Sequence, residues 1–324
     1  MIIAVTRRLP VVATELLEGA GLTVRMHDAD DPPSREALLS LVDGADGLIC
    51  LLSDRVDEAL LDAAGPGLRV AANYAVGLDN VDLEACRARG VAVAHTPGVL
   101  TDATADLAWA LLLAVARRVR EGDSLVRSGG WSGWSPLQLL GASLAGRTFG
   151  VVGLGRIGAA AAQRARGFGM DVVYTGRSRR EREEVRLEAR FVPLGELLEV
   201  SDVVSLHCPS TPETRHLIDA EALGRMRSSA ILVNTARGDV VDEAALVDAL
   251  REGQIGGAGL DVFEREPVVH EGLVGLENVV LAPHLGSATV ETRGAMARMV
   301  AEAVIAVLEG GTVEHLAVPP GGGA

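Results

Sequence analysis

The feature that most constrains this chain is a glycine-rich turn, Gly153-Leu154-Gly155-Arg156-Ile157-Gly158, which lies between an apolar strand and a helix. Residues 149–152 predict the strand and residues 157–166 predict the helix. The spacing Gly-x-Gly-x-x-Gly allows a tight turn, close approach of the backbone to a pyrophosphate, and close packing of helix on strand. A tight turn without a ligand is the simpler alternative. Because a helix start also offers free N–H groups to phosphates, we favour a dinucleotide site.

Short apolar runs alternate with helical patterns on both sides of this turn. Before it, the pattern predicts strands at Ile2–Val5, Gly47–Leu51, Leu68–Ala72 and Val91–Ala94. In a second block, which begins at Thr148 and contains the turn, it predicts strands at Phe149–Val152, Val172–Thr175, Val203–His207, Ile231–Asn234, Gly257–Leu260 and Val279–Leu281. Long helices are predicted at Asp102–Arg120 and Val290–Leu308. Such alternation is typical of right-handed βαβ units, so we expect an α/β protein with two doubly wound, mostly parallel sheets.

Composition excludes several classes of function. With 324 residues the chain is long enough for two domains, and a net charge of −14 argues against nucleic acid as a partner. No apolar run is long enough for a membrane span, so we expect neither membrane insertion nor membrane binding. Three widely spaced cysteines fit a reducing cytoplasm, and the histidines show no metal-ligand spacing, so no metal is expected.

All 30 basic residues are arginine, and lysine is absent from the sequence. P-loop nucleotide hydrolysis, pyridoxal-phosphate catalysis, protein kinase activity and short-chain dehydrogenase chemistry each require a lysine amine. The chemistry of this chain must therefore rest on histidine, arginine, carboxylates or a cofactor.

The strand after the glycine turn bears on the choice of cofactor. A site for NAD usually places a carboxylate at the end of this strand, to bind the adenosine ribose. Here the strand runs into Gly176, Arg177 and Ser178, with further arginines behind them. A guanidinium and a hydroxyl can bind a 2′-phosphate. We therefore predict that NADP(H) is preferred and NAD(H) is possible, although the arginines could simply form a solvated face.

Three later segments place chemically active side chains at strand ends. Arg237 follows the strand at 231–234, Glu266 follows the strand at 257–260, and His284 follows the strand at 279–281. Because ligands bind at the carboxyl edge of open α/β sheets, these side chains could meet over one cleft. The simpler alternatives are a helix-start arginine near Asp242, a solvated turn glutamate with Glu264 as its rival, and a buried structural histidine.

At these residues the chain resembles the D-isomer-specific 2-hydroxyacid dehydrogenases, and within them the glyoxylate/hydroxypyruvate reductase branch. The likeness runs from Asn73-Tyr74-Ala75-Val76-Gly77-Leu78-Asp79-Asn80 through Thr101-Asp102-Ala103-Thr104-Ala105-Asp106 to the segment around His284. Gly130-Trp131-Ser132-Gly133-Trp134-Ser135-Pro136 and Tyr174-Thr175-Gly176-Arg177 are similar to segments of that branch. The resemblance implies a Rossmann NAD(P)-binding domain over 100–287, inserted into a flavodoxin-like substrate domain made of 1–99 and 288–324.

The resemblance also implies roles for single residues. Arg237 would bind the substrate carboxylate, His284 would exchange a proton with the keto oxygen as general acid and base, and Glu266 would orient His284. Asp261 would hold the nicotinamide carboxamide, while Ser53, Val76 and Gly77 would cradle the substrate. We expect further cofactor contacts at Thr104, Cys208, Pro209, Thr235, Ala236 and Gly286.

These expectations together predict an NADPH-preferring reductase of glyoxylate and hydroxypyruvate that forms D-2-hydroxy acids. In this family the segment carrying Trp131 and Trp134 crosses to a second subunit, which implies a homodimer. For Trp131 we favour packing in a local core, and we expect Trp134 at the rim of the partner's substrate pocket. Alternatives are a D-3-phosphoglycerate dehydrogenase, another D-2-hydroxyacid dehydrogenase, and a dinucleotide-sensing, corepressor-like binding protein. We expect no regulatory domain after the last helix, which disfavours the first alternative.

Overall fold

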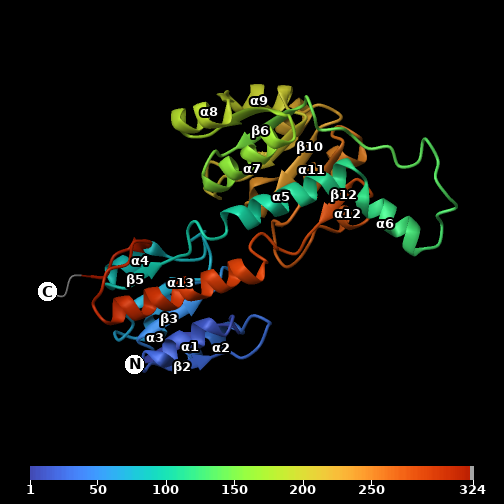
Figure 1. Ribbon diagram of the computed structural model, residues 1–324. Coiled ribbons are helices and arrows are strands. Elements are labelled where there is room, and N and C mark those ends of the chain that lie inside the picture. Colours follow the sequence, from blue (N-terminus) through green and yellow to red (C-terminus); the bar gives the residue numbers. More distant parts are fainter. Residues whose placement is uncertain (322–324) are drawn as a thin grey trace. The chain divides into compact units, whose positions relative to one another are not determined.

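The computed structural model describes residues 1–321 of the chain. It contains two units, Met1–Leu100 with the segment from Ser287 onward, and Thr101–Gly286. The chain leaves the first unit after Leu100 and returns to it at Ser287, so the second unit is an insertion (Figure 1). Of the segment 288–324 that we assign to the first unit from sequence, residues 322–324 lie outside the described residues.

The first unit has a six-stranded sheet in the order β13-β5-β4-β3-β1-β2. All neighbours pair in parallel except β13, which pairs antiparallel with β5. The order 2-1-3-4-5 of the first five strands is that of flavodoxin-like folds. The strands are β1 Ile2–Val5, β2 Thr23–Met26, β3 Gly47–Cys50, β4 Val70–Asn73, β5 Ala92–Ala94 and β13 Leu316–Val318.

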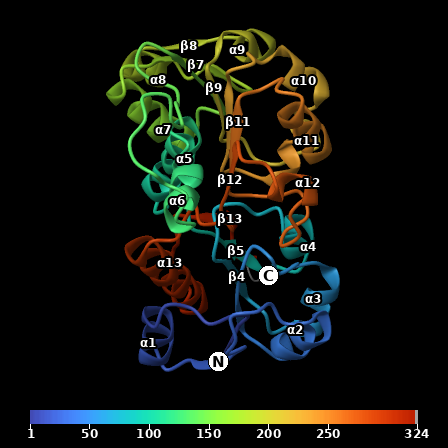
Figure 2. The ribbon, with the colours of Figure 1, turned by 90° about the vertical axis from the view of Figure 1, so that its right-hand side faces the viewer.

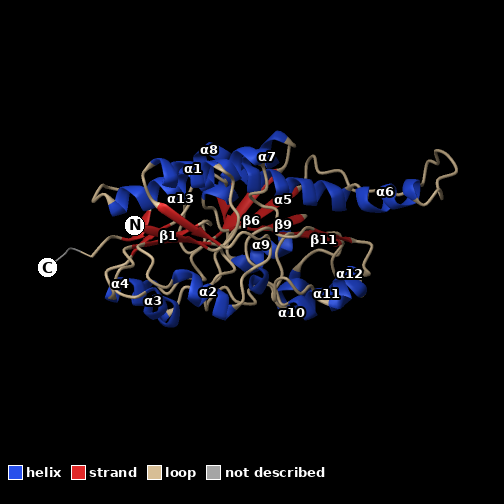
Figure 3. Ribbon diagram, turned by 90° about the horizontal axis from the view of Figure 1, so that it is seen from below, coloured by secondary structure: helices blue, strands red, loops and turns tan. Residues whose placement is uncertain are grey.

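Helices cover both faces of this sheet. Figure 3 shows α1 and α13 on one side and α2, α3 and α4 on the other. Leu38, Leu60 and Cys86, one from each of the latter three helices, pack with Leu48 and Val93 of the strands in one buried cluster. Burying both faces accounts for the near-continuous apolar character of β1, β3 and β4. The helices are α1 Val12–Gly19, α2 Arg35–Val42, α3 Glu58–Ala64, α4 Leu83–Ala88 and α13 Val290–Leu308.

The second unit has a seven-stranded, fully parallel sheet in the order β12-β11-β10-β9-β6-β7-β8. With β6 counted as the first strand, the order reads 3-2-1-4-5-6 plus one more strand, which is the Rossmann arrangement. The expected class, two doubly wound α/β domains, is therefore confirmed. The strands are β6 Thr148–Val152, β7 Asp171–Thr175, β8 Ala189–Phe191, β9 Val203–Leu206, β10 Ile231–Asn234, β11 Gly257–Leu260 and β12 Val279–Leu281.

Two buried clusters hold this sheet between helices. One joins α5 and α7 to β6, where Trp109 stacks between Phe149 and Phe168. The other joins α9, α10 and α11 to the opposite face. Figure 2 shows α10, α11 and α12 on one side of β11 and β12, with α5 and α7 on the other. The helices are α5 Thr101–Ala116, α6 Val119–Arg127, α7 Arg156–Gly167, α8 Glu181–Leu187, α9 Leu194–Val200, α10 Ala220–Arg225, the 3₁₀ turn η1 Gly238–Val240, α11 Glu243–Arg251 and α12 Glu271–Val274.

The sequence pattern missed the outermost strands β2 and β8 and also β13. All three are short and only partly buried, so they lack the apolar run that marks an inner strand. None of the helices within residues 1–321 is both long and apolar enough to cross a membrane.

The long helix expected over Asp102–Arg120 is wrong in extent. It ends at Ala116, and a second helix begins at Val119 after Arg118 adopts a left-handed conformation with φ 52°. The carbonyl of Ala116 accepts a hydrogen bond of 2.8 Å from the amide of Ala142, which comes from the returning segment. This tertiary contact takes the carbonyl that a continuing helix would use.

Candidate dinucleotide and active site

Two of the three turn glycines are required by protein packing. Gly153 has φ +96°, and a Cβ built there would lie 2.8 Å from the carbonyl oxygen of His207. A Cβ at Gly158 would lie 2.2 Å from the carbonyl oxygen of Gly153. A side chain at either position would therefore push α7 away from β6 or distort the turn.

Gly155 differs, because a Cβ there would meet no protein atom within 4 Å. It is the N-cap of the twelve-residue helix α7, and no side chain caps the N–H groups of the first turn. After β10, the buried hydroxyl of Thr235 has no hydrogen-bond partner among residues 1–321. Open space at Gly155 and the uncapped amides fit a bound dinucleotide phosphate, and the orphaned hydroxyl after β10 fits a further polar contact at the same edge of the sheet.

The arginines that follow β7 differ in their contacts. The guanidinium of Arg179 lies 2.6 Å from Glu184, which also accepts the hydroxyl of Tyr174 at 2.5 Å. These hydrogen bonds lower the pKa of Glu184 to about 2. Arg177 is exposed, and its side chain has no hydrogen bond or ion pair within the described part of the chain. Arg179 is therefore occupied by the protein, whereas Arg177 can bind a ligand.

Arg237, Glu266 and His284 follow three adjacent parallel strands, β10, β11 and β12. Nδ1 of His284 lies 2.9 Å from Oε2 of Glu266. The charge of Arg237 contributes to the pKa of Glu266, which places the guanidinium near the same carboxylate. The structure thus brings the three side chains together at one edge of the sheet.

The protonation of this pair follows from its contacts. Burial raises the pKa of Glu266, but the hydrogen bond and charge of His284 outweigh burial, so the pKa lies below its ordinary value. An ionised carboxylate only accepts hydrogen bonds, so Nδ1 of His284 carries the hydrogen. Because that nitrogen is engaged, Nε2 is the atom of His284 that can exchange a proton with a substrate.

Asp261 holds the backbone beside His284. It is fully buried after β11, and its two carboxylate oxygens accept the amides of Leu285 at 2.6 Å and Gly286 at 2.9 Å. Its carbonyl accepts the amide of His284, whose φ is 54°. Burial raises the pKa of Asp261 to about 6. The contact with the nicotinamide carboxamide stays a prediction, and the structure adds a positioning role.

The turn carrying Arg237 is fixed by its neighbours. The side-chain amide of Asn234 donates to the carbonyl of Arg237 at 2.8 Å and accepts the amide of Ala236 at 3.0 Å. A Cβ at Gly238 would lie 1.9 Å from the carbonyl carbon of Phe263. The arginine turn therefore packs directly on the acidic turn that follows β11.

Two supporting residues carry no signal in the sequence. Glu243, buried at the start of α11, accepts the amide of Glu264 at 2.8 Å. Nε2 of His216 lies 2.9 Å from the carboxylate of Glu264. Glu264, which rivalled Glu266 as the partner of His284, is therefore paired with a different histidine. No motif surrounds Glu243 or His216, so only the fold reveals them.

The other expected cofactor residues lie around this edge. Thr104, in the first turn of α5, donates its hydroxyl to the carbonyl of Gly286 at 3.0 Å. Cys208 and Pro209 follow β9, and the amide nitrogen of Cys208 would lie 2.9 Å from a Cβ at Gly153. Their contacts with a cofactor stay predictions.

The expected substrate residues Ser53, Val76 and Gly77 belong to the first unit. They follow the carboxyl ends of β3 and β4, and the side-chain amide of Asn73 donates to the carbonyl of Gly77 at 2.8 Å. Asn73 also donates to Asn80 at 3.0 Å, so the loop after β4 is internally braced.

Trp131 and Trp134 lie on a segment that extends beyond α6, away from the rest of its unit (Figure 1). Trp131 is 54% exposed and Trp134 is 83% exposed. The expectation that Trp131 packs in a local core is therefore wrong, because more than half of its surface is exposed in the described part of the chain.

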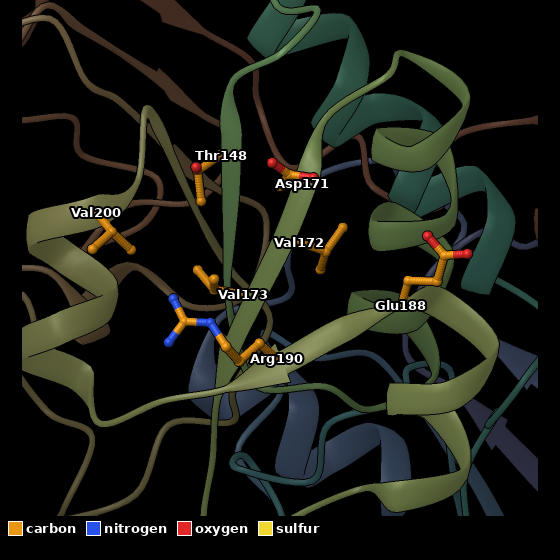
Figure 4. Close-up of a pocket in the computed structure, with 7 residues that line it drawn as sticks. All are labelled: Thr148, Asp171, Val172, Val173, Glu188, Arg190 and Val200. Carbon is orange, nitrogen blue, oxygen red and sulfur yellow. The ribbon is translucent and has the colours of Figure 1, made fainter.

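A cavity of about 290 Å³ lies elsewhere, at the amino ends of β6 and β7 (Figure 4). The glycine turn and Arg237 follow the carboxyl ends of the strands, so this cavity is at the opposite edge of the sheet. It is lined by Thr148, Asp171, Val172, Val173, Glu188, Arg190 and Val200.

Fold and site together define a dinucleotide-binding α/β protein with an acid–base pair and a nearby arginine. Residues 109–286 match the family described as D-isomer specific 2-hydroxyacid dehydrogenase, NAD binding domain. The glyoxylate reductase of Thermococcus onnurineus is 51% identical over 312 residues, covering 95% of this chain and 93% of the relative. The chain therefore belongs to the D-isomer specific 2-hydroxyacid dehydrogenase family.

Solved structures agree with this assignment. A crystal structure of a Thermus thermophilus protein matches with a TM-score of 0.93 at 50% identity, covering 98% of this chain and all of that chain. The NADPH-dependent glyoxylate/hydroxypyruvate reductase of Sinorhizobium meliloti, in complex with NADP and malonate, matches with a TM-score of 0.87 at 35% identity. That match covers 100% of this chain and 99% of the other.

Proposed function

We propose that this protein reduces small 2-keto acids, glyoxylate and hydroxypyruvate in particular, to D-2-hydroxy acids with NADPH as the preferred reductant. The pairing of His284 with Glu266 close to Arg237, on the sheet that carries the dinucleotide turn, is the observation that supports it most strongly. Relatives that share half of their residues with this chain are glyoxylate reductases.

The residues of the site divide the chemistry between them. Arg237 binds the carboxylate of the keto acid, because a guanidinium offers a fixed fork of donors to two oxygens. When bound, reduced nicotinamide supplies hydride to the carbonyl carbon. Nε2 of His284 donates a proton to the carbonyl oxygen, and the Glu266 carboxylate offsets the charge of the imidazolium. In the reverse direction His284 accepts that proton.

Preference for NADPH is proposed from the second strand of the nucleotide domain. No carboxylate ends β7, and Arg177 and Ser178 are exposed beside Gly176. Removing the carboxylate removes repulsion of a 2′-phosphate, while a guanidinium attracts it.

A homodimer is proposed from the arm formed by α6 and the segment up to Gly141. No residue of α6 is buried, and Val126, Trp134, Leu137 and Leu140 on the arm are exposed. A patch of this kind on one protruding segment is typical of a protein interface. A second copy of the chain is the proposed occupant, with Trp134 at the rim of that copy's substrate pocket. Sedimentation of the protein as a monomer would contradict the proposal.

Oxidation of NADPH and NADH, followed with glyoxylate, hydroxypyruvate and phosphohydroxypyruvate in turn, tests the proposed reaction. We expect turnover with the first two acids and a lower KM for NADPH than for NADH. A strong preference for phosphohydroxypyruvate would instead indicate a D-3-phosphoglycerate dehydrogenase. Dinucleotide binding without oxidation in any arm would indicate a sensing protein.

A further inference from the structure

The first unit carries an arginine that none of the assigned roles uses. Arg7 lies two residues past the carboxyl end of β1, at the same edge of the sheet as the loops after β3 and β4. Its side chain is only 12% exposed. Ligands bind at this edge in open α/β sheets, so a buried cation here is placed where it can act on a substrate.

Arg7 contacts a residue already expected to bind substrate. Its NH2 donates to Oγ of Ser53 at 2.9 Å, and lies 3.5 Å from Oδ1 of Asp54. A guanidinium has donors and no acceptor, so the hydroxyl oxygen of Ser53 must accept from it. The hydroxyl hydrogen of Ser53 is then directed away from Arg7 and is available to an anion.

The turn that carries Ser53 is rigid on its other side. Asp54 is 3% exposed, and its carboxylate accepts the hydroxyl of Thr6 and, at 2.8 Å, the amide of Leu51. Asn80 donates to the carbonyls of Leu51 at 3.0 Å and Asp54 at 2.9 Å. The turn is therefore held in place, and Arg7 sets the direction of the one exposed hydroxyl on it.

The hydrogen bonds of Arg7 are not those of a residue optimised for stability alone. Its Nε is buried and has no acceptor among residues 1–321. A buried donor without a partner destabilises the fold, and such groups recur where function constrains a side chain. The carboxylate of Asp54 also offsets much of the positive charge of Arg7. Arg7 is therefore better suited to orienting the hydroxyl of Ser53 than to attracting anions by its own charge.

We propose that Arg7 is a positioning residue for the substrate carboxylate, acting by fixing Ser53 as a hydrogen-bond donor. This inference rests on the proposed function, and it concerns only residues of the first unit. Because the guanidinium fork sets the direction of the hydroxyl, a lysine at position 7 would supply the charge without the geometry.

The test compares KM and kcat for glyoxylate in Arg7→Gln, Arg7→Lys, Ser53→Ala and the double variant Arg7→Gln/Ser53→Ala. We expect KM to rise roughly tenfold in each single variant, with kcat changed much less. The double variant should be no worse than Ser53→Ala, because the two residues act in series. Full rescue of KM by Arg7→Lys, or additive effects in the double variant, would overturn the proposal.

Arg8→Gln is the matched control. Arg8 is adjacent in sequence, its side chain is 52% exposed, and it pairs with Asp28 at 2.7 Å instead of with the Ser53 turn. Its KM should equal that of the unaltered protein. If Arg7→Gln fails to fold, Ser53→Ala still decides, since an unchanged KM in that variant also overturns the proposal.

A binding measurement separates this inference from the proposed reaction. Oxalate, an unreactive dicarboxylate, should raise the thermal midpoint of the unaltered protein and of Arg8→Gln more than that of Arg7→Gln and Ser53→Ala. If no keto acid is reduced but this pattern holds, the proposed reaction fails and the carboxylate site stands. Equal oxalate stabilisation of all variants, or none of the unaltered protein, overturns the role of Arg7.

Discussion

The backbone of His284 is held by Asp261, whose carbonyl accepts the histidine amide at 2.9 Å while its carboxylate binds the next two amides. The imidazole is held separately by Glu266, at 2.9 Å. One carboxylate therefore fixes the main chain of the proposed acid and another fixes its ring. Such double support limits the motion of a side chain that must meet a carbonyl oxygen at hydrogen-bond distance.

The ring contact predicts a difference between two neighbouring glutamates. Glu266→Gln should lower kcat for glyoxylate by at least tenfold, because the amide cannot offset the charge of the imidazolium. His284→Ala should lower kcat by roughly 100-fold or more. Glu264→Gln is the control, since Glu264 pairs with His216, and its kcat should stay within about twofold of normal. Near-normal turnover in His284→Ala would refute the acid assignment.

The main-chain contact predicts a pH dependence of stability. The pKa of Asp261 is about 6 in the folded protein and 3.8 when exposed, so the folded state binds the proton more tightly. This stabilising contribution is fully present below the unfolded pKa and is lost as pH rises through the folded pKa of about 6. The stability of the unaltered protein relative to Asp261→Asn should therefore fall by on the order of 3 kcal/mol from about pH 3 to about pH 7.

Denaturant titrations of both proteins across this pH range measure that difference directly. A difference in the free energy of unfolding that does not vary with pH would contradict the prediction. Asp261→Asn should also lower kcat at every pH, because its side-chain NH₂ would face a backbone N–H that now donates to a carboxylate.

The open space at Gly155 predicts a variant that folds but binds the cofactor poorly. Gly155→Ala places its Cβ where no protein atom lies, so the thermal midpoint should change little. The same Cβ should block approach of a pyrophosphate, and KM for NADPH should rise at least tenfold. Gly167→Ala, at the other end of α7 and equally unobstructed, should leave both quantities near normal. Unchanged KM in Gly155→Ala would place the phosphates elsewhere.

The two arginines after β7 predict a change in coenzyme preference. Arg177→Gln should raise KM for NADPH about tenfold and leave KM for NADH nearly unchanged, because only NADPH carries the 2′-phosphate. Arg179→Gln should change neither KM by much, since Arg179 is bound to Glu184. Equal effects of Arg177→Gln on both coenzymes would count against the assignment.

Some strands and helices could be predicted from the sequence, and others could not. Inner strands such as β6, β9 and β10 are buried on both faces and form continuous apolar runs, so their type could be predicted from sequence. The strands β2, β8 and β13 lack that run, and the helix break at Arg118 depends on a contact with Ala142 from a distant segment.

The glycine turn was determined by the sequence alone, because a strand, a fixed glycine spacing and a helix are local. Arg237, Glu266 and His284 could also be identified as candidate site residues from the sequence, since each follows the end of a predicted strand. The pairing of Glu266 with His284 is expected from the family resemblance, and the structure has that contact. Tertiary structure alone paired Glu264 with His216, bound Arg179 to Glu184, and placed Arg7 against Ser53. Most of these contacts join residues far apart in the chain, and Glu264 and Glu266 are only two positions apart in one turn. The physical reason is that strand order and side-chain direction determine such contacts, and local sequence patterns do not encode either of them.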